Sequence, residues 1–384
     1  MTHQLLAVAG MVLLGIAAIH SILTLLAVLI WKLRRPPSLP SGPLPGVTVL
    51  KPLCGPEPGL YENLRSFCLI AVPRYQIVFG TRDPADPAIA VAEQLQREFP
   101  QLDMQIVVSP VQHGSNRKVS NLINMLQQAR YEVLIIADSD ARVGKGYLEA
   151  VTRPLLEPSV GLVTTLFRSV PTRGIWPRLG AMYVNDWYMP SVLLAWLFGH
   201  REYASGQTMA LRRDTLEAMG GLRCIADHLA DDYELGQQVR RLQQRIVLSP
   251  YLPEAVQYDP DRETLTDHEL RWMSTVRVLA PTSFTFLFLS FTLPLAALGW
   301  ALRAPGFATS WATLLVAIAV VARLALFVLV RLQDRRLPLR DLWLLPVRDV
   351  LLVWIWWRGF FASRLVWRDN KFQIDARGIM RSPS

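Results

Sequence analysis

The chain has 384 residues, of which 51% are hydrophobic and 18% are charged. Average soluble proteins carry roughly 25% charged residues, and the mean hydropathy of this chain is +0.25. These values exclude intrinsic disorder as the main state and argue against an ordinary soluble enzyme. The formal net charge is +9. Most of the excess comes from Lys32, Arg34 and Arg35 and from residues 331–371, which hold nine basic and four acidic residues. Basic residues beside apolar runs are typical of membrane proteins, so we expect no nucleic-acid partner.

The N-terminal apolar run predicts a membrane anchor. Residues 5–31 supply the roughly 20 apolar residues that a span needs. No acidic residue, Lys or Arg occurs before Lys32, so the run lacks the positively charged start of a cleaved signal peptide. We therefore predict an uncleaved anchor over residues 1–35 and a proline-rich linker over residues 36–46.

Two further spans are predicted in the segment 281–332, over residues 281–302 and 308–330. The basic residues that follow belong on the cytosolic side. This topology gives a multi-pass protein of the inner (cytoplasmic) membrane with its central domain in the cytosol. The three cysteines form no CxxC motif, which is consistent with a reducing compartment.

Two apolar runs are too short or too charged for a simple span. Residues 342–361 contain Arg348 and Asp349, and charges at the bilayer centre are costly. We expect an interfacial or re-entrant segment there, inside a basic tail over residues 333–384. Residues 187–198 are either part of the core or a patch that enters the membrane surface.

The central residues 47–280 alternate between strand and helix patterns. The expected strands are residues 47–50, 76–79, 104–108 and 133–137, and the expected helices are residues 59–70, 88–98 and 119–129. Strands that alternate with helices indicate an α/β fold with a doubly wound parallel sheet. Ligands bind beyond the carboxyl ends of the strands in such sheets.

Acidic residues stand at that edge. Asp83 follows the second strand, and Asp138 and Asp140 follow the strand of residues 133–137. A single acid after a strand is commonly a turn former or a helix cap, but three at one edge favour a ligand site. Asp138 and Asp140 can converge on one Mg²⁺ or Mn²⁺, which prefers oxygen ligands and keeps substrate phosphates in its shell.

Two later motifs have both a structural and a functional interpretation. The acidic residues 231–234 favour the first turn of a helix through the helix dipole, or they include a catalytic carboxylate. Arg271 and Trp272 are either a membrane-interface anchor or a site in which Arg271 neutralises a diphosphate. The sequence has no Walker motif, no GxGxxG and no HExxH.

In chain order, Asp83, the Asp138–Asp140 pair, Asp232 and Arg271-Trp272 resemble the D, D, D, (Q/R)xxRW pattern of membrane glycosyltransferases. More closely, the chain resembles the ceramide glucosyltransferase family over about residues 47–374. The shared stretches include LKPL at 50–53, GSNRKVSNL at 114–122, GGL at 220–222 and Trp367-Arg368. The first position of the last motif is His268 where the family has Gln or Arg.

The resemblance implies a GT-A-type fold, an α/β doubly wound mixed sheet with N-terminal and C-terminal transmembrane helices. It implies that Asp232 is the general base and that Asp138 and Asp140 bind the metal. The implied nucleotide-sugar-binding residues are Lys51, Pro52, Asp83, Lys118, Asp138, Arg271 and Trp272. The implied acceptor-binding residues are Gly206, Gln207 and Trp272.

Within the family the chain looks most like the bacterial branch associated with hopanoid biosynthesis. That likeness implies inverting transfer of N-acetylglucosamine from UDP-GlcNAc to bacteriohopanetetrol, with Mg²⁺ or Mn²⁺ as cofactor. Alternatives are glucosyl transfer from UDP-glucose to ceramide or another lipid, and a processive polysaccharide synthase. A non-catalytic membrane receptor for a lipid or nucleotide is an alternative from a different class.

Overall fold

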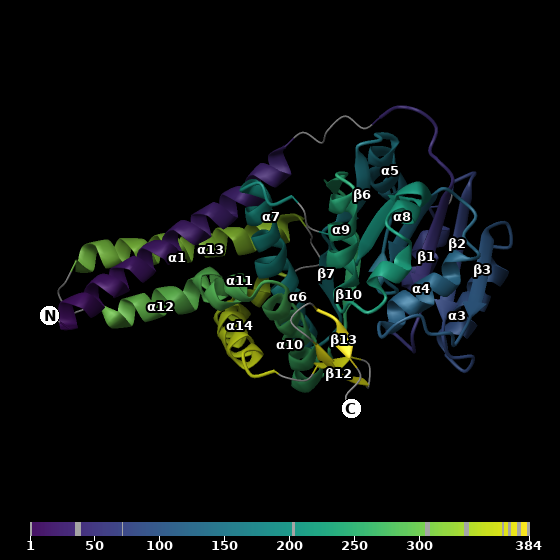
Figure 1. Cartoon of the computed structure of the whole chain (residues 1–384). Helices are drawn as coiled ribbons and strands as arrows, with labels where there is room; N and C mark the ends of the chain where they lie inside the picture. The colour runs from purple at the N-terminus through teal and green to yellow at the C-terminus, as the bar shows by residue number, and fades with distance from the viewer. Residues whose placement is uncertain are drawn as a thin grey trace. The chain divides into compact units, whose positions relative to one another are not determined.

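The computed structural model describes residues 2–34, 40–70, 72–201, 204–303, 308–333, 338–362, 365–367, 370–374 and 378–381. Residues 36–39 of the expected linker and Arg335, Arg336 and Arg368 of the expected basic tail lie outside the described residues. The chain divides into two compact units (Figure 1). The helical unit comprises residues 1–35, 169–199 and 259–371, and the sheet unit comprises residues 36–168, 200–258 and 372–384.

These units differ from the expected domain of residues 47–280. Residues 169–199 and 259–280 belong to the helical unit, together with the apolar helices. They form α6 (Ile175–Tyr183), α7 (Met189–Leu197) and α10 (Arg262–Leu279). Helix α10 carries enough polar residues to resemble the surface of a globular domain, and α6 and α7 are apolar but, at nine residues each, too short to indicate a membrane span.

A seven-stranded mixed sheet forms the centre of the sheet unit. Its spatial order is β3 (Asp103–Val108), β2 (Tyr75–Thr81), β1 (Val47–Pro52), β4 (Val133–Ala137), β8 (Thr208–Arg212), β6 (Val160–Thr165) and β9 (Arg245–Ser249). The first four strands are parallel, as the sequence predicted. The sheet is mixed because β8 runs antiparallel to both of its neighbours.

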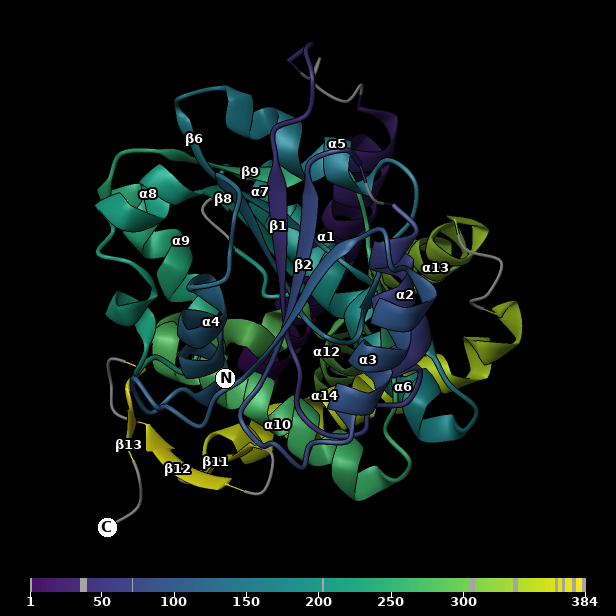
Figure 2. The same cartoon turned by 90° about the vertical axis from the view of Figure 1, so that its right-hand side faces the viewer.

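Helices cover both faces of this sheet, as Figure 2 shows. On one side lie α2 (Leu60–Cys68) and α3 (Ala88–Glu98), and on the other lie α4 (Arg117–Leu126), α8 (Arg213–Ala218) and α9 (Asp231–Arg241). The side chains of strand β4 alternate between the two layers of helices. Val133, Ile135 and Ala137 join the core under α2 and α3, while Leu134 and Ile136 join the core under α4 and α9. This alternation is the two-residue period of a strand.

Shorter elements complete the sheet unit. They are β5 (Ala141–Arg142), α5 (Tyr147–Thr152), β10 (Glu254–Gln257), β12 (Asn370–Ile374) and β13 (Met380–Arg381). Strand β10 pairs with β5, and β12 pairs with β13. Strand β7 (Arg168–Pro171) and strand β12 each span a boundary between the units in the sequence, and β11 (Leu365–Trp367) lies within the helical unit.

In the helical unit, α1 (Thr2–Leu33) packs along α12 (Thr292–Leu302) and α13 (Thr309–Gln333) (Figure 1). Two helices of the described residues, α1 and α13, are long and apolar enough to cross a membrane. Gly10 and Gly299 bring α1 and α12 together. A Cβ on Gly10 would lie 2.6 Å from the carbonyl oxygen of Gly299, the close backbone approach typical of small residues between membrane helices.

The predicted span of residues 281–302 is not one straight helix. It consists of α11 (Pro281–Thr285), a 3-10 turn over Phe286–Ser290 and α12, with a bend of 71°. Pro294 sits in the first turn of α12. Proline has no N–H and its ring clashes with the carbonyl four residues earlier, so the helix cannot continue back through Ser290.

The charges in the apolar segments form buried ion pairs within the helical unit. In α14 (Leu345–Gly359), Arg348 donates two hydrogen bonds of 2.6 and 2.7 Å to Glu269 of α10. Asp349 accepts a hydrogen bond of 2.9 Å from Arg323 of α13. These pairs explain how Arg348 and Asp349 are accommodated. An interfacial or re-entrant course for residues 342–361 stays a prediction.

The apolar run of residues 187–198 belongs to the helical unit. A π-helical turn over Val184–Tyr188 leads into α7, whose Trp196 packs edge-on against Trp31 of α1 at 5.2 Å between ring centroids. Asp186 in the π-helical turn accepts a hydrogen bond of 2.9 Å from Arg331 of α13. The run therefore packs against α1.

Candidate active site

The loop after β4 carries the acidic pair. Asp138 and Asp140 are half-buried, and the fully buried Lys51 at the end of β1 donates a hydrogen bond to the carbonyl oxygen of Asp138. Burial lowers the pKa of Lys51 to about 8, although Asp140, Asp138 and Glu57 act in the opposite direction. Lys51 therefore lies beneath the acidic loop and fixes its backbone. The expectation for Lys51 was contact with the nucleotide.

Asp140 is crowded by negative charge. Burial, followed by the charges of Asp138 and Glu57, raises its pKa to about 7. Its Oδ1 accepts a hydrogen bond of 3.2 Å from the Gln207 side-chain amide. Glu57, which also accepts a hydrogen bond from the Ser139 hydroxyl, was missed because it lies in an irregular loop with no motif around it.

This donor set fits a hard divalent cation. A cation would relieve the repulsion among the carboxylates that raises the pKa of Asp140. Among the described residues, no group of three or more His, Cys, Asp or Glu side chains is arranged to hold a metal ion. Two carboxylates with the remaining positions left to phosphate and water are the usual arrangement for Mg²⁺.

Lys118 joins the acidic loop to helix α9. Its Nζ lies 2.7 Å from Asp138 Oδ1 and 3.3 Å from Asp231 Oδ2. Asn116 caps α4 by accepting the Val119 N–H at 3.1 Å, which places Lys118 in the first turn. The role of Asp231 as a partner of Lys118 was missed, because the sequence alone does not say which acid of the 231–234 cluster faces which neighbour.

Asp232 stands in the first turn of α9, where the helix dipole favours an acid. Its Oδ2 accepts the Gly206 N–H at 2.9 Å, and its Oδ1 accepts the Tyr233 N–H at 2.8 Å. Burial, followed by the charge of Asp231, raises the pKa of Asp232 to about 6, although Lys118 acts to lower it. A carboxylate with a pKa near the working pH is suited to accept a proton.

The side chains of Asp232, Asp138 and Lys118 all lie close to Gly206. A Cβ built on Gly206 would lie 3.4 Å from Asp232 Oδ2 and 3.6 Å from both Asp138 Oδ2 and Lys118 Nζ. The missing side chain thus leaves one small space lined by the expected base, the acidic pair and a cation. Gly206 and Gln207 were expected to contact the acceptor, and the structure places both beside these carboxylates.

Asp83 and Pro52 lie at the ends of adjacent strands. Pro52 closes β1 opposite Gly80 of β2. Asp83 is exposed, and its Oδ1 accepts the Ala85 N–H at 2.8 Å, as in an ordinary turn. The buried neighbour Asp86 accepts hydrogen bonds from Gly55, Thr81 and Ala88 and so holds the two strand ends together.

Arg271 and Trp272 belong to α10 in the helical unit. Trp272 packs on Tyr183 with ring centroids 5.2 Å apart and on His268 with ring centroids 4.2 Å apart. His268 Nδ1 lies 3.5 Å from Asp259 Oδ1. Burial lowers the pKa of His268, with Arg271 acting in the same direction and Asp259 opposing. His268, at the position that departs from the family motif, therefore supports the Trp272 ring.

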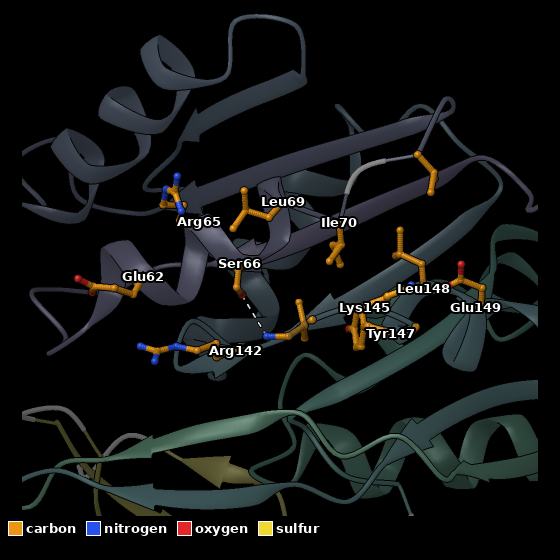
Figure 3. Close-up of a pocket in the computed structure, with 14 residues that line it drawn as sticks. Glu62, Arg65, Ser66, Leu69, Ile70, Arg142, Lys145, Tyr147, Leu148 and Glu149 are labelled. Carbon is orange, nitrogen blue, oxygen red and sulfur yellow. Dashed lines mark hydrogen bonds between the residues drawn. The ribbon is translucent and has the colours of Figure 1, made fainter. Parts of the chain in front are cut away.

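A separate cavity of about 630 Å³ opens in the sheet unit (Figure 3). It is lined by α2 and by the segment after β5, where the Ser66 hydroxyl accepts the Val143 N–H at 3.1 Å. None of its lining residues is an expected site residue. The acidic cluster around Gly206 and this cavity are therefore different features.

Comparison with known proteins gives a consistent picture. The model of glycosyl transferase family 21 matches residues 12–380. Ceramide glucosyltransferase 3 of Caenorhabditis elegans is 25% identical over 197 residues, which cover 51% of this chain and 43% of that protein. Ceramide glucosyltransferase of Komagataella phaffii is 33% identical over 122 residues, covering 30% of this chain and 24% of that protein. The chain spans less than half the length of these relatives.

Among solved structures, mannosyltransferase PcManGT from Pyrobaculum calidifontis, in complex with GDP-Man and Mn²⁺, superposes with a TM-score of 0.51 at 18% identity. The alignment covers 92% of this chain and 98% of that one. At this identity the likeness shows the fold alone, which confirms the predicted GT-A arrangement.

Proposed function

The chain belongs to glycosyl transferase family 21, and from this premise we propose that it transfers a sugar from a nucleotide-sugar donor to a hydroxyl of a membrane lipid. The observation that carries the proposal is the space at Gly206, which Asp232, Asp138 and Lys118 face within 3.6 Å of one point. A proton acceptor, an acidic pair and a cation around one space are the groups that this reaction needs.

In the proposed reaction, Asp232 accepts the proton of the lipid hydroxyl while the hydroxyl oxygen attacks the anomeric carbon. A new carbon–oxygen bond forms to the lipid, and the bond to the diphosphate breaks with its electrons going to the leaving group. One base and no protein nucleophile predict inversion at the anomeric carbon. The pKa of about 6 leaves Asp232 ionised at neutral pH, ready to take the proton.

Other residues orient the groups around that step. Lys51 holds the backbone of the acidic loop from below, and Lys118 holds Asp138 in place beside α9. A divalent cation bound by Asp138 and Asp140 would supply positive charge for the phosphates of the donor. The solved mannosyltransferase complex with Mn²⁺ supports a divalent metal, and Mg²⁺ or Mn²⁺ is proposed here.

The remaining site residues are carried over from the family resemblance as predictions. Asp83 and Pro52 are predicted to contact the nucleotide, and Gly206 and Gln207 the acceptor. Arg271 is predicted to bind the diphosphate. Trp272 is predicted to bind near both donor and acceptor.

For the substrates, we propose UDP-GlcNAc as donor and bacteriohopanetetrol as acceptor, with UDP-glucose and ceramide as the second choice. The names of the relatives favour the second pair, and the resemblance to the hopanoid-associated branch favours the first. We also propose that the sheet unit faces the cytosol at the inner membrane, because nucleotide sugars are made in the cytosol and the basic residues flank the spans.

The test is a transfer assay with labelled donor and purified enzyme in liposomes that contain bacteriohopanetetrol or ceramide. The variant Asp232→Asn should lose most turnover and still bind UDP, because the amide keeps the shape of the side chain and cannot accept the proton. Asp214→Asn, at an exposed carboxylate of α8, is the control and should behave as wild type. Wild-type turnover by Asp232→Asn would contradict the proposal, and UDP binding without release from any donor would favour a receptor. Products of many sugars per lipid would favour a processive synthase.

A further inference from the structure

The last described residues of the chain pair with the segment that leads into α9. We call residues 378–380 the C-terminal strap. The Leu229 N–H donates to the carbonyl oxygen of Gly378 at 3.0 Å, and the Met380 N–H donates to the carbonyl oxygen of Asp227 at 2.8 Å. His228 and Ile379 form an antiparallel bridge between these two bonds. The strap is thus an added strand beside the segment that ends two residues before Asp231.

The strap also makes contacts on the side that faces away from residues 227–229. The side chain of Met380 is 3% exposed, so it is part of the packed interior. The backbone of Met380 also pairs with Ile374 of β12. The strap therefore has partners on both of its edges and is more than a loose chain end.

The opposite side of residues 226–229 is bonded to the start of α4. Asp227 Oδ1 accepts the backbone N–H of Ser115 at 2.7 Å and its hydroxyl at 2.9 Å. Asn116 donates its side-chain amide to the His228 carbonyl oxygen and its backbone N–H to the Ala226 carbonyl oxygen, both at 2.8 Å. Residues 226–229 thus lie between the strap and the cap of the helix that carries Lys118.

Residues 226–229 are closely packed against the segment that leads into α4. A Cβ on Gly114 would lie 2.5 Å from the carbonyl oxygen of Ala226, so the two segments are in close backbone contact. Asn116 precedes Lys118 by two residues, and Leu229 precedes Asp232 by three. A shift of residues 226–229 would therefore move the lysine and the carboxylate that face Gly206.

We propose that the C-terminal strap is a positioning element of the active site, which fixes residues 226–229 and through them the placement of Asp232 and Lys118. This inference rests on the proposed function for its catalytic consequence. The described hydrogen bonds of the strap go to the backbone of Asp227 and Leu229, so its residues act on the site through residues 226–229 and are positioning residues.

The experiment compares two truncations of the full-length protein in detergent or nanodiscs. Ending the chain after residue 377 removes the strap, whereas ending it after residue 381 keeps every described strap contact and is the matched control. Amide hydrogen exchange at Leu229, whose N–H donates to the strap, reports the docking directly. UDP binding and turnover then report the site itself.

We expect the shorter chain to exchange the Leu229 amide faster by about tenfold or more, the loss expected for one protecting hydrogen bond. Turnover should fall by about tenfold to a hundredfold while the Kd for UDP changes by less than about threefold, since misplacement of a base mainly affects the chemical step. The pH profile should also broaden or shift, because the surroundings of Asp232 change. The control should match wild type in all four measurements.

A single substitution tests the same contact without shortening the chain, in case the truncated protein misfolds. Met380→Pro removes the N–H that donates to Asp227 and leaves the chain length unchanged, while Met380→Leu keeps the N–H and a similar volume and should restore wild-type behaviour. If both the short chain and Met380→Pro show wild-type exchange at Leu229 and wild-type turnover, the strap has no positioning role. Absence of transfer by the wild type would count against the proposed function, and the exchange data would still decide the docking.

Discussion

Lys118 lies between two carboxylates that come from different parts of the chain, at 2.7 Å from Asp138 Oδ1 and 3.3 Å from Asp231 Oδ2. Burial acts to lower the pKa of Lys118, but Asp138 and Asp231 outweigh it and hold the pKa above the usual value. The ammonium is therefore charged throughout the neutral range, and it lowers the pKa of Asp232 beside it.

This relationship predicts the effect of Lys118→Met on the pH profile. The pKa of Asp232 is already raised to about 6, and Lys118 is the charge that opposes a further rise. A base must be ionised to accept a proton, so activity is lost as the pH falls through its pKa. Removing Lys118 should move the acidic limb of kcat/KM to higher pH, measured over a range of about 5 to 9. The variant should lose more activity at pH 6 than at pH 8.

Lys118→Arg is the matched control, because it keeps the positive charge between the same carboxylates. Its acidic limb should lie close to that of the wild type. An acidic limb of Lys118→Met that stays in place or moves to lower pH would show that Asp232 is not the group that titrates.

Gly206→Ala should reduce turnover without reducing the thermal stability of the protein. The added Cβ would meet Asp232, Asp138 and Lys118 only at 3.4–3.6 Å, so the side chain fits and the melting temperature should change little. It would nevertheless fill the space where the reacting groups are proposed to meet. Turnover should fall by about a hundredfold, the effect of an ångström-scale displacement of a substrate.

Gly144→Ala is the control for that substitution, because among the residues that the structure describes its Cβ would meet only the Tyr251 hydroxyl, at 3.7 Å. It should keep wild-type turnover. If Gly206→Ala also retained wild-type turnover, the space at Gly206 would not be the site of reaction.

Sequence patterns predicted the first half of the sheet unit well because those signals are local. The strand of residues 133–137 and the helix of residues 88–98 match β4 and α3, since each is a clean apolar run or a helical period with turn residues around it. Asp138 and Asp140 were found for the same reason: they follow directly after a buried strand.

The rest could not be found locally, because it depends on pairing between distant segments. Nothing near Gly206 says that it faces Asp232, and nothing near Lys51 says that its side chain is buried under the acidic loop. The bend before α12 was missed because a hydropathy window sums over Pro294 without registering its missing N–H. Arg348 looked costly because its partner Glu269 is 79 residues away.

The Arg348–Glu269 pair gives a stability prediction. Both side chains are 1% exposed, so Glu269→Leu would leave a buried guanidinium without its carboxylate. Breaking a buried pair from one side typically costs about 3–5 kcal/mol, and the thermal midpoint in detergent should fall clearly. The double variant Glu269→Leu/Arg348→Met removes both charges and should recover most of the loss. A double variant as unstable as the single one would contradict this account.

Gly10 and Gly15 lie five residues apart on α1. We expect substitution by alanine to have opposite effects on thermal stability at the two positions. In Gly10→Ala, the Cβ would lie 2.6 Å from the Gly299 carbonyl oxygen and 2.9 Å from the backbone nitrogen of Arg303, so α1 and α12 must move apart. Overpacking of this kind costs about 1–3 kcal/mol. In Gly15→Ala nothing in the described part of the chain lies within 4 Å of the Cβ, and alanine in a helix interior gains about 0.5–1 kcal/mol over glycine. Thermal unfolding in detergent should therefore show a lower midpoint for Gly10→Ala and an equal or higher one for Gly15→Ala, and the reverse order would mean that α1 and α12 do not pack through Gly10.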